Sequence, residues 1–146
     1  MNKPVDWVIL LEANGCECVE CGKVENNFIH GYCNAQTHGM YKYGHPEFQL
    51  VLQMKPEMIM YTLNRLGLMV QSGRRFKNGD IVDDLFEGYS ALLTEFEENG
   101  RIMLRVMIPD PNHKFPNDEG CQTEYTYQAL PIEDLYVDNL ITKKIN

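Results

Sequence analysis

The sequence predicts an α+β domain, in which one mixed or antiparallel sheet of about five strands carries two packed helices. Short runs of β-forming residues recur between turn residues, and two longer segments have apolar side chains at helical spacing. The 146 residues contain no internal repeat and no Pro/Gly/Ser-rich linker. We therefore expect residues 1–146 to fold as a single domain.

The first helix is expected over residues 56–72. Pro56 suits the first helical position, and Glu57 suits the first turn, where a carboxylate interacts favourably with the helix dipole. Gly73 is a typical residue after a helix end. Four apolar residues follow at i, i+4, i+7 and i+11, which is one helix face. They are Ile59, Leu63, Leu66 and Val70. We expect this face to pack on the sheet.

The second helix is expected over residues 83–98, because seven apolar side chains between Val82 and Phe96 follow helical spacing. Gly88 would cost such a helix up to about 1 kcal/mol. The alternative is a β-hairpin folded at Asn99-Gly100, a pair typical of tight hairpin turns. We favour the helix because its apolar matches outnumber the single turn pair.

Five segments are predicted to be strands because they are rich in β-forming residues or alternate between apolar and polar residues. They are residues 5–11, 28–33, 48–54, 102–108 and 125–130. The mostly apolar fourth segment is expected at the centre of the sheet. A cysteine-rich loop at 16–27 completes an N-terminal part that spans 1–27. Pro131 and Glu133 open a short helix or turn, and the polar residues 138–146 are expected to fray.

Charge and hydropathy argue against several classes of partner. The net charge is −8 at pH 7 and the cations are scattered, whereas a nucleic-acid surface needs clustered Lys and Arg. The nearest cluster, Arg74, Arg75 and Lys77, is explained by the C-terminus of a helix. No apolar run reaches the roughly 18 residues of a membrane span, and the first residues lack the features of a signal peptide. We expect a cytoplasmic protein that binds neither large nucleic acids nor membranes.

Several short motifs follow one another in a characteristic order. They are Gly44-His45-Pro46-Glu47-Phe48, Leu63-Asn64-Arg65-Leu66, Leu104-Arg105-Val106-Met107-Ile108-Pro109-Asp110, Phe115-Pro116-Asn117, Gly120-Cys121 and Tyr127-Gln128-Ala129-Leu130. Over residues 27–130 this set resembles the bacterial and phage family called domain of unknown function 4262. The resemblance supports a compact fold and implies no particular activity. Ile108 and Asn117 stand where the family usually has tryptophan, which implies a changed or lost pocket if those rings line one.

Three of the five cysteines crowd into residues 16–21, unlike the spread cysteines of a disulfide framework. Cys18 and Cys21 have the spacing of a zinc knuckle, and Cys16 is a candidate third ligand. Cys33 or His30 would be the fourth ligand of a structural zinc site. The sequence has no second Cys-x-x-Cys pair, so a reduced loop without metal remains the alternative.

Two loops are candidates for ligand binding. Residues 34–46 and 109–120 adjoin strand ends and are longer than a structural connection needs. Their aromatic and polar side chains suit a small polar ligand. These side chains are His38, Tyr41, Tyr43, His45, Asp110 and His113. In the alternative interpretation both loops are merely irregular connections, and His45 hydrogen-bonds its own turn.

The function that these features favour is a non-enzymatic binding module for a small polar molecule or a protein partner, and a homo-oligomer is compatible with the sequence. One alternative is a small metal-dependent hydrolase, with His30, His38 or His45 acting together with Glu47 and Asp110. Another is a phage or host-defence inhibitor, or a protein that sequesters a nucleotide signal.

Nucleophilic catalysis by a cysteine is disfavoured by the acidic residues near Cys121. Cys121 lies in one loop with His113, its candidate base, but Asp118 and Glu119 are close in sequence. Neighbouring carboxylates disfavour a thiolate, which is the reactive form of cysteine.

Overall fold

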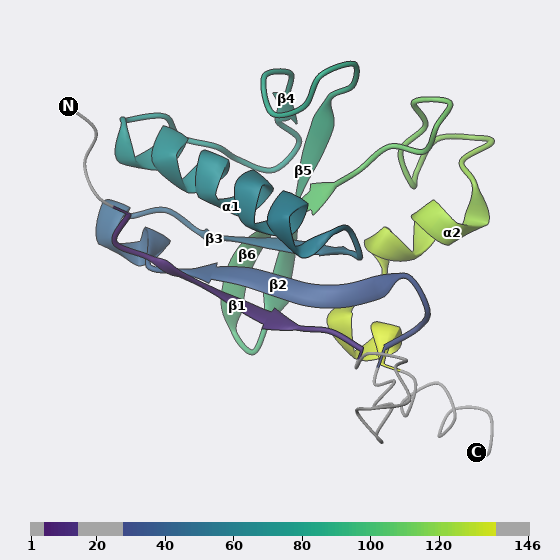
Figure 1. Cartoon of the computed structure of the whole chain (residues 1–146), viewed down its shortest axis with the longest axis horizontal. Coiled ribbons are helices and arrows are strands. Elements are labelled where there is room, and N and C mark those ends of the chain that lie inside the picture. Colours follow the sequence, from purple (N-terminus) through teal and green to yellow (C-terminus); the bar gives the residue numbers. More distant parts are fainter. Residues whose placement is uncertain (1–4, 15–27, 137–146) are drawn as a thin grey trace.

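The computed structural model describes residues 5–14 and 28–136, which form one mixed sheet with a long helix on one face (Figure 1). The six strands have the order β1-β2-β3-β6-β5-β4. Neighbouring strands are antiparallel except β3 and β6, which are parallel. The predicted fold class, α+β with one mixed sheet, is confirmed.

The elements have the following bounds. The strands are β1 (Val8–Glu12), β2 (Tyr32–His38), β3 (Glu47–Leu52), β4 (Ile81–Val82), β5 (Ala91–Glu98) and β6 (Arg101–Met107). The α-helices are α1 (Pro56–Gln71) and α2 (Thr123–Thr126), and the 3₁₀ turns are η2 (Met40–Tyr43), η3 (Tyr127–Ala129) and η4 (Ile132–Leu135). In the described part of the chain, no helix is long and apolar enough to cross a membrane.

Helix α1 confirms the prediction for residues 56–72. The four side chains of its predicted face are almost fully buried and belong to the core between helix and sheet. Trp7 packs beside them on Gly67, where an added Cβ would lie 2.5 Å from a Trp7 ring carbon. The Trp7 indole N–H also donates to Asn64 Oδ1 at 2.9 Å. The chain segment before β1 is therefore held to the middle of α1.

The helix predicted over residues 83–98 is wrong, and the hairpin alternative is correct. Strand β5 pairs with β6 through a turn at Asn99-Gly100, and both turn residues have positive φ (54° and 77°). Ala91 and Leu93 point into the core beneath α1, so the segment alternates with the period of a strand. The apolar spacing between Val82 and Phe96 suggested a helix because Val82 and Leu85 also reach this core, Val82 from β4 and Leu85 from the bend after it.

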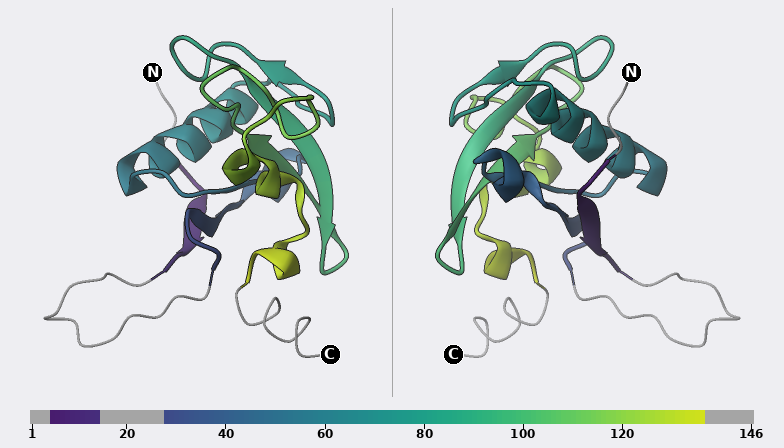
Figure 2. Two further views of the ribbon diagram at one scale, coloured as in Figure 1. Left: turned by 90° about the vertical axis from the view of Figure 1, so that its right-hand side faces the viewer. Right: turned by 90° about the vertical axis from the view of Figure 1, so that its left-hand side faces the viewer.

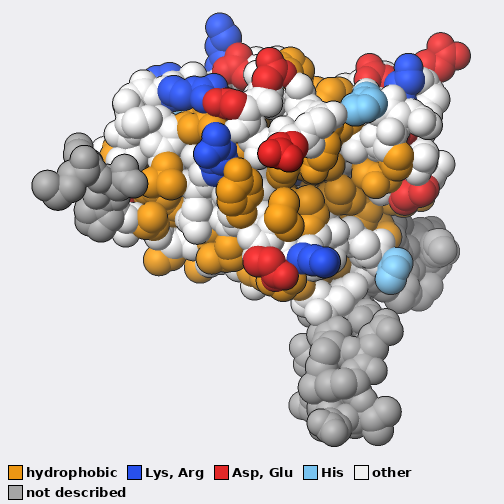
Figure 3. Space-filling view, turned by 45° about the horizontal axis from the view of Figure 1, so that its top comes forward, with side chains coloured by type: hydrophobic (Ala, Val, Ile, Leu, Met, Phe, Trp, Pro, Cys, Tyr) orange, Lys and Arg blue, Asp and Glu red, His pale blue; other side chains and the backbone are white. Residues whose placement is uncertain are grey.

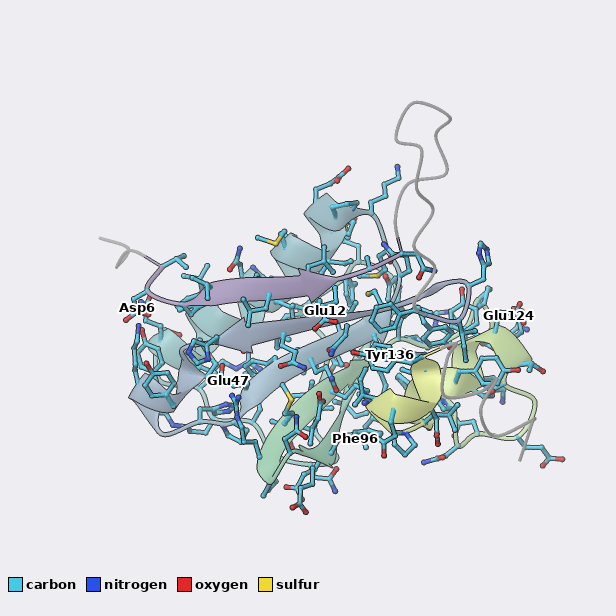
Figure 4. All side chains as sticks on the ribbon, turned by 90° about the horizontal axis from the view of Figure 1, so that it is seen from below. Asp6, Glu12, Glu47, Phe96, Glu124 and Tyr136 are labelled. Atoms are coloured by element: carbon cyan, nitrogen blue, oxygen red, sulfur yellow. The ribbon has the colours of Figure 1, made fainter. Side chains whose placement is uncertain are left out.

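Strand β2 lies later than predicted, because residues 34–38 continue it and residues 28–31 precede it. Asn34 and Gln36 resembled loop residues, yet they occupy the sheet face opposite α1, where polar side chains bond one another. Gln36 and Gln49 each donate to Asn34 Oδ1 at 3.0 Å, and both also donate to the Glu98 carboxylate. Figure 4 looks onto this face and shows Glu12, Phe96 and Tyr136 on it.

The strand predicted at 125–130 is also wrong, because this segment forms α2 and η3. The buried Gln128 side chain donates to the Ile108 carbonyl and accepts from the Ile108 N–H, both at 2.8 Å. One side chain thus satisfies backbone groups just beyond the end of β6, in place of another strand. Buried Arg105 donates to the carbonyls of Gln128 and Leu130, which attaches this C-terminal segment to the sheet. The ribbons in Figure 2 show the C-terminal segment, in yellow-green, beside the sheet.

Candidate functional site

The two predicted binding loops lie at opposite ends of the sheet, so the prediction that they converge is wrong. The first loop, which contains η2, precedes β3 (Figure 1). The second loop follows β6, and because β3 and β6 are parallel it lies at the far end of β3. There Asp110 and His113 line a cavity together with Leu52 and Gln53. The six candidate residues therefore form two separate groups.

At the first end, His45 is a buried structural residue. Its Nε2 accepts a hydrogen bond from the Phe76 N–H at 3.0 Å, and its Nδ1 lies 2.8 Å from the Pro46 carbonyl. The acceptor role of Nε2 assigns the proton to Nδ1, which donates to that carbonyl. The ring also packs against Phe48 and Phe76. Burial lowers the pKa of His45, so the neutral form is favoured.

Glu47 is the second structural residue of this turn, and only 4% of its surface is exposed. Its carboxylate accepts a hydrogen bond from the Thr37 hydroxyl at 2.8 Å. It also accepts from the backbone N–H groups of Gly39, Met40 and Tyr41 at 3.1–3.3 Å. These donors at the start of η2 have no partner within the turn, so the carboxylate acts as a cap. The Gly-His-Pro-Glu motif therefore builds the connection between β2 and β3.

The remaining candidates at this end lie on the surface of η2. His38 and Tyr41 are exposed, and the centroids of their rings are 5.6 Å apart. The Tyr43 hydroxyl donates to Asp6 Oδ1 at 2.6 Å and accepts from Gln71 at 3.1 Å. The hydrogen bond to Asp6 raises the pKa of Tyr43. Tyr43 thus joins the N-terminal segment to the end of α1.

At the other end, Asp110 organises the loop that follows β6. Its Oδ1 accepts from the N–H groups of Asn112 and Lys114, and its Oδ2 accepts from the N–H of Gln122, all at 2.9 Å. Burial alone would raise the pKa of Asp110, but these backbone hydrogen bonds hold it below its usual value. The carboxylate is consequently occupied by its own loop.

His113 is the residue that this loop presents to solvent. It is exposed and has a φ of 63°, and Asn99 is the one other described residue besides glycine with a positive φ. Its N–H donates to the Asp110 carbonyl at 2.8 Å, which closes the turn. The loop therefore holds His113 in a backbone conformation that non-glycine residues adopt infrequently.

Two adjoining cavities form a cleft beside His113. One, of about 360 Å³, is lined by Leu52, Gln53, Met54, Tyr89, Ile108, Pro109, Asp110, Pro111, His113 and Tyr125. The other, of about 370 Å³, is lined by Ile81, Gly88, Tyr89, Ser90, Pro109, His113 and Phe115. Tyr89, Pro109 and His113 belong to both linings. We call this pair of cavities the β3–β6 cleft.

The walls of the β3–β6 cleft are partly aromatic. Phe86 stacks on Tyr89, with ring centroids 4.8 Å apart and an interplanar angle of 16°. Burial and the nearby Tyr125 raise the pKa of Tyr89, so its hydroxyl remains protonated at neutral pH. Sequence reasoning missed Tyr89 and Tyr125 because it placed them on a predicted helix and a predicted strand. The one signal available in the sequence was position, since Tyr89 directly follows Gly88 and Tyr125 lies five residues after Gly120.

The environments of the two described cysteines disfavour the thiolate form. Cys33 is fully buried in β2 beneath α1, and burial raises its pKa to about 12. Burial and the carboxylates of Asp110, Asp118 and Glu124 raise the pKa of Cys121. Among the described residues, no three His, Cys, Asp or Glu side chains are grouped as a metal site would need. Cys16, Cys18 and Cys21 lie outside the described residues, whereas His30 is described and exposed.

Comparison with known families assigns most of the chain to one family. The family model described as "Domain of unknown function (DUF4262)" matches residues 11–122. The chain belongs to the DUF4262 family. No curated protein and no solved structure matches the chain significantly.

The predicted resemblance to the DUF4262 family is thereby confirmed, with a match that begins earlier than expected and ends before α2. The motif residues of the resemblance have mainly structural contacts: His45 and Glu47 hold a turn, and Asn64 binds Trp7. Ile108, which replaces a tryptophan of the family, is nearly buried and lines the β3–β6 cleft. A tryptophan at that position would change the shape of the cleft.

Proposed function

We propose that this DUF4262 domain is a binding module whose β3–β6 cleft takes a small, uncharged molecule with a planar ring and polar edges. The observation that carries the proposal is His113, an exposed residue at positive φ on the shared wall of the two cavities. Such a backbone conformation costs free energy and persists only where surrounding contacts impose it. Here the Asp110 carboxylate and its three N–H donors impose it.

The chemistry of the cleft supports this class of ligand. Each cavity is within the usual size range of small-molecule sites, about 300–1,000 Å³. Tyr89, Tyr125 and Phe115 offer ring faces and edges for stacking, and the His113 imidazole offers one donor and one acceptor. Neither lining, as far as the structure describes the chain, contains Lys or Arg, so an uncharged ligand suits it better than a nucleotide phosphate.

The contacts of the carboxylates argue for binding rather than metal-dependent hydrolysis. A hydrolase of the kind considered above would use Glu47 and Asp110 as metal ligands. Both carboxylates accept several backbone hydrogen bonds, and the two ring nitrogens of His45 are engaged as well. If Glu47, Asp110 or His45 turned toward a metal ion, the backbone N–H groups that it now accepts from would lose their partners, which is unfavourable.

The test is protein-observed NMR with a library of neutral planar heterocycles. We expect hits to shift the backbone amides of residues 88–90 and 109–115, because these residues line the cleft. His113→Ala and Tyr89→Ala should each weaken such hits about five- to tenfold, since a buried aromatic contact or hydrogen bond contributes roughly 1–1.5 kcal/mol.

The matched control is Tyr61→Ala, which removes an exposed tyrosine from α1, outside the cleft. It should leave the affinity of every hit unchanged. Hits that shift other regions, or that keep their affinity in both cleft variants, would contradict the proposal.

A further inference from the structure

Strand β1 is an open edge of the sheet. It is the first strand in the order, and no described strand pairs with its outer side. Its pairing with β2 is regular through all five residues, so no bulge twists the edge away. Proteins usually protect such edges with lysine, proline, a bulge or a very short strand. Within β1, Glu12 is the one charged residue.

The exposed side chains of β1 are mostly apolar. Val8 and Leu10 are 55% and 57% exposed on the face opposite α1, and Leu11 is 41% exposed on the α1 side. Met60 is 41% exposed and extends the apolar surface onto α1. It lies one turn before Asn64, on the side of α1 that contacts Trp7. Figure 3 shows hydrophobic side chains gathered on the face that carries α1. Within the described residues 5–14 and 28–136, the outer backbone groups of this edge have no strand partner, so it offers both backbone groups and apolar side chains to a partner.

The sequence of β1 suits pairing with its own copy. A two-fold axis perpendicular to the sheet makes the two β1 strands antiparallel and leaves the α1 faces of both copies on the same side. On such an axis one residue of β1 lies opposite its own copy. With Leu10 on the axis, all five residues pair, Ile9 lies opposite Leu11, and Val8 lies opposite Glu12. With Ile9 on the axis, Asp6 would lie opposite Glu12, which brings like charges together. With Leu11 on the axis, only Leu10, Leu11 and Glu12 would pair with β1 of the other copy, because Val8 and Ile9 would lie opposite residues beyond the end of the strand.

We propose that two copies of this chain associate through antiparallel pairing of their β1 strands about Leu10, which makes one continuous sheet. Pairing would satisfy the outer N–H and C=O groups of β1 and cover Leu10 and its neighbours. The β3–β6 cleft contains no β1 residue, so both copies retain it. The association is therefore independent of the proposed ligand.

The first test is the mass of the full chain in sedimentation equilibrium over a range of micromolar concentrations. We expect a dimer whose dissociation constant rises by more than about 100-fold in Leu10→Lys, because this change holds two ammonium groups opposite each other. The control is Ile81→Lys on the other edge strand, β4, where Ile81 is 51% exposed. It should leave the dimer intact, and circular dichroism checks that both variants fold.

A second test fixes the register. In Leu10→Cys the two Cα atoms should lie about 4.5–5.5 Å apart, which is within the range that a disulfide bridges. Oxidation should therefore yield more covalent dimer than in wild type, whereas Leu68→Cys on α1 should not. A wild-type chain that stays monomeric at every concentration would overturn the proposal. So would a dimer that tolerates Leu10→Lys and gains no cross-link in the Leu10→Cys variant.

Discussion

Two histidines of the candidate loops, His45 and His113, have opposite environments in the structure. His45 and His113 both lie in loops and both were candidates for binding. The structure buries His45, with both ring nitrogens engaged, and exposes His113 on a cleft wall. The distinction depends on Phe76, a residue 31 positions away whose N–H binds His45. Such long-range partners leave no local pattern.

We expect His45→Ala to destabilise the protein by at least about 1–3 kcal/mol, because the buried Phe76 N–H loses its acceptor. Loss of ring packing against Phe48 and Phe76 adds to this cost. Urea unfolding gives the free energy directly. His113→Ala, at an exposed position, serves as the control and should change the stability by no more than about 0.5 kcal/mol. An equally small change for His45→Ala would show that its contacts are not structural.

The same residue predicts how stability depends on pH. The folded state lowers the pKa of His45 from its ordinary value of 6.5. As the pH falls below 6.5, the unfolded chain takes up a proton that the folded chain resists, so the free energy of unfolding decreases. The stabilisation from neutral His45 is thus complete above pH 6.5 and is lost as the pH falls through the folded pKa.

Urea unfolding at a series of pH values between 7.5 and 5 measures this dependence. In His45→Gln the decrease should be shallower, because the titrating group is absent while a donor and an acceptor remain. An unchanged slope in that variant would assign the pH dependence to other groups.

At the scale of the elements, α1 was predictable because its periodicity, its first residue and its last turn all agree. Leu66 is fully buried and Leu68 is 42% exposed, as the predicted face requires. We expect Leu66→Ala to cost about 2–5 kcal/mol of unfolding free energy. Leu68→Ala should cost no more than about 0.5 kcal/mol. Thermal or urea unfolding of the two variants compares them, and equal losses would mean that the buried face is misassigned.

The zinc knuckle is a prediction at the same scale. Protein purified without chelator should contain about one zinc ion per chain by elemental analysis, since two thiolates of a Cys-x-x-Cys pair share one metal. Cys18→Ser or Cys21→Ser should remove it, and Cys121→Ser, outside the cluster, should not. The core position of Cys33 makes exposed His30 the better-placed fourth ligand. Metal-free wild-type protein of full stability would exclude the site.

At the scale of the whole molecule, the sheet brings together side chains whose roles the linear pattern obscured. Asn34, Gln36 and Gln49 resembled loop or surface residues but form a bonded layer on the face opposite α1. Arg105 lies at the end of this layer, 3.7 Å from the Phe96 ring centroid, and binds Gln49. Burial lowers its pKa to about 10, which still leaves it charged at neutral pH. The residue types of such a hydrogen-bonded polar sheet face are those of a solvent-exposed loop, so the sequence alone does not distinguish the two.

The sequence by itself determined the fold class, the helix α1, the strands around residues 48 and 105, and membership of the DUF4262 family. These features depend on local spacing and short motifs, which each segment carries without reference to the others. Tertiary structure decided whether residues 91–98 pair as a strand, which histidine is buried, and which loop borders the cleft. Strand pairing and parallel order place those residues, and both arise from contacts between segments far apart in the chain.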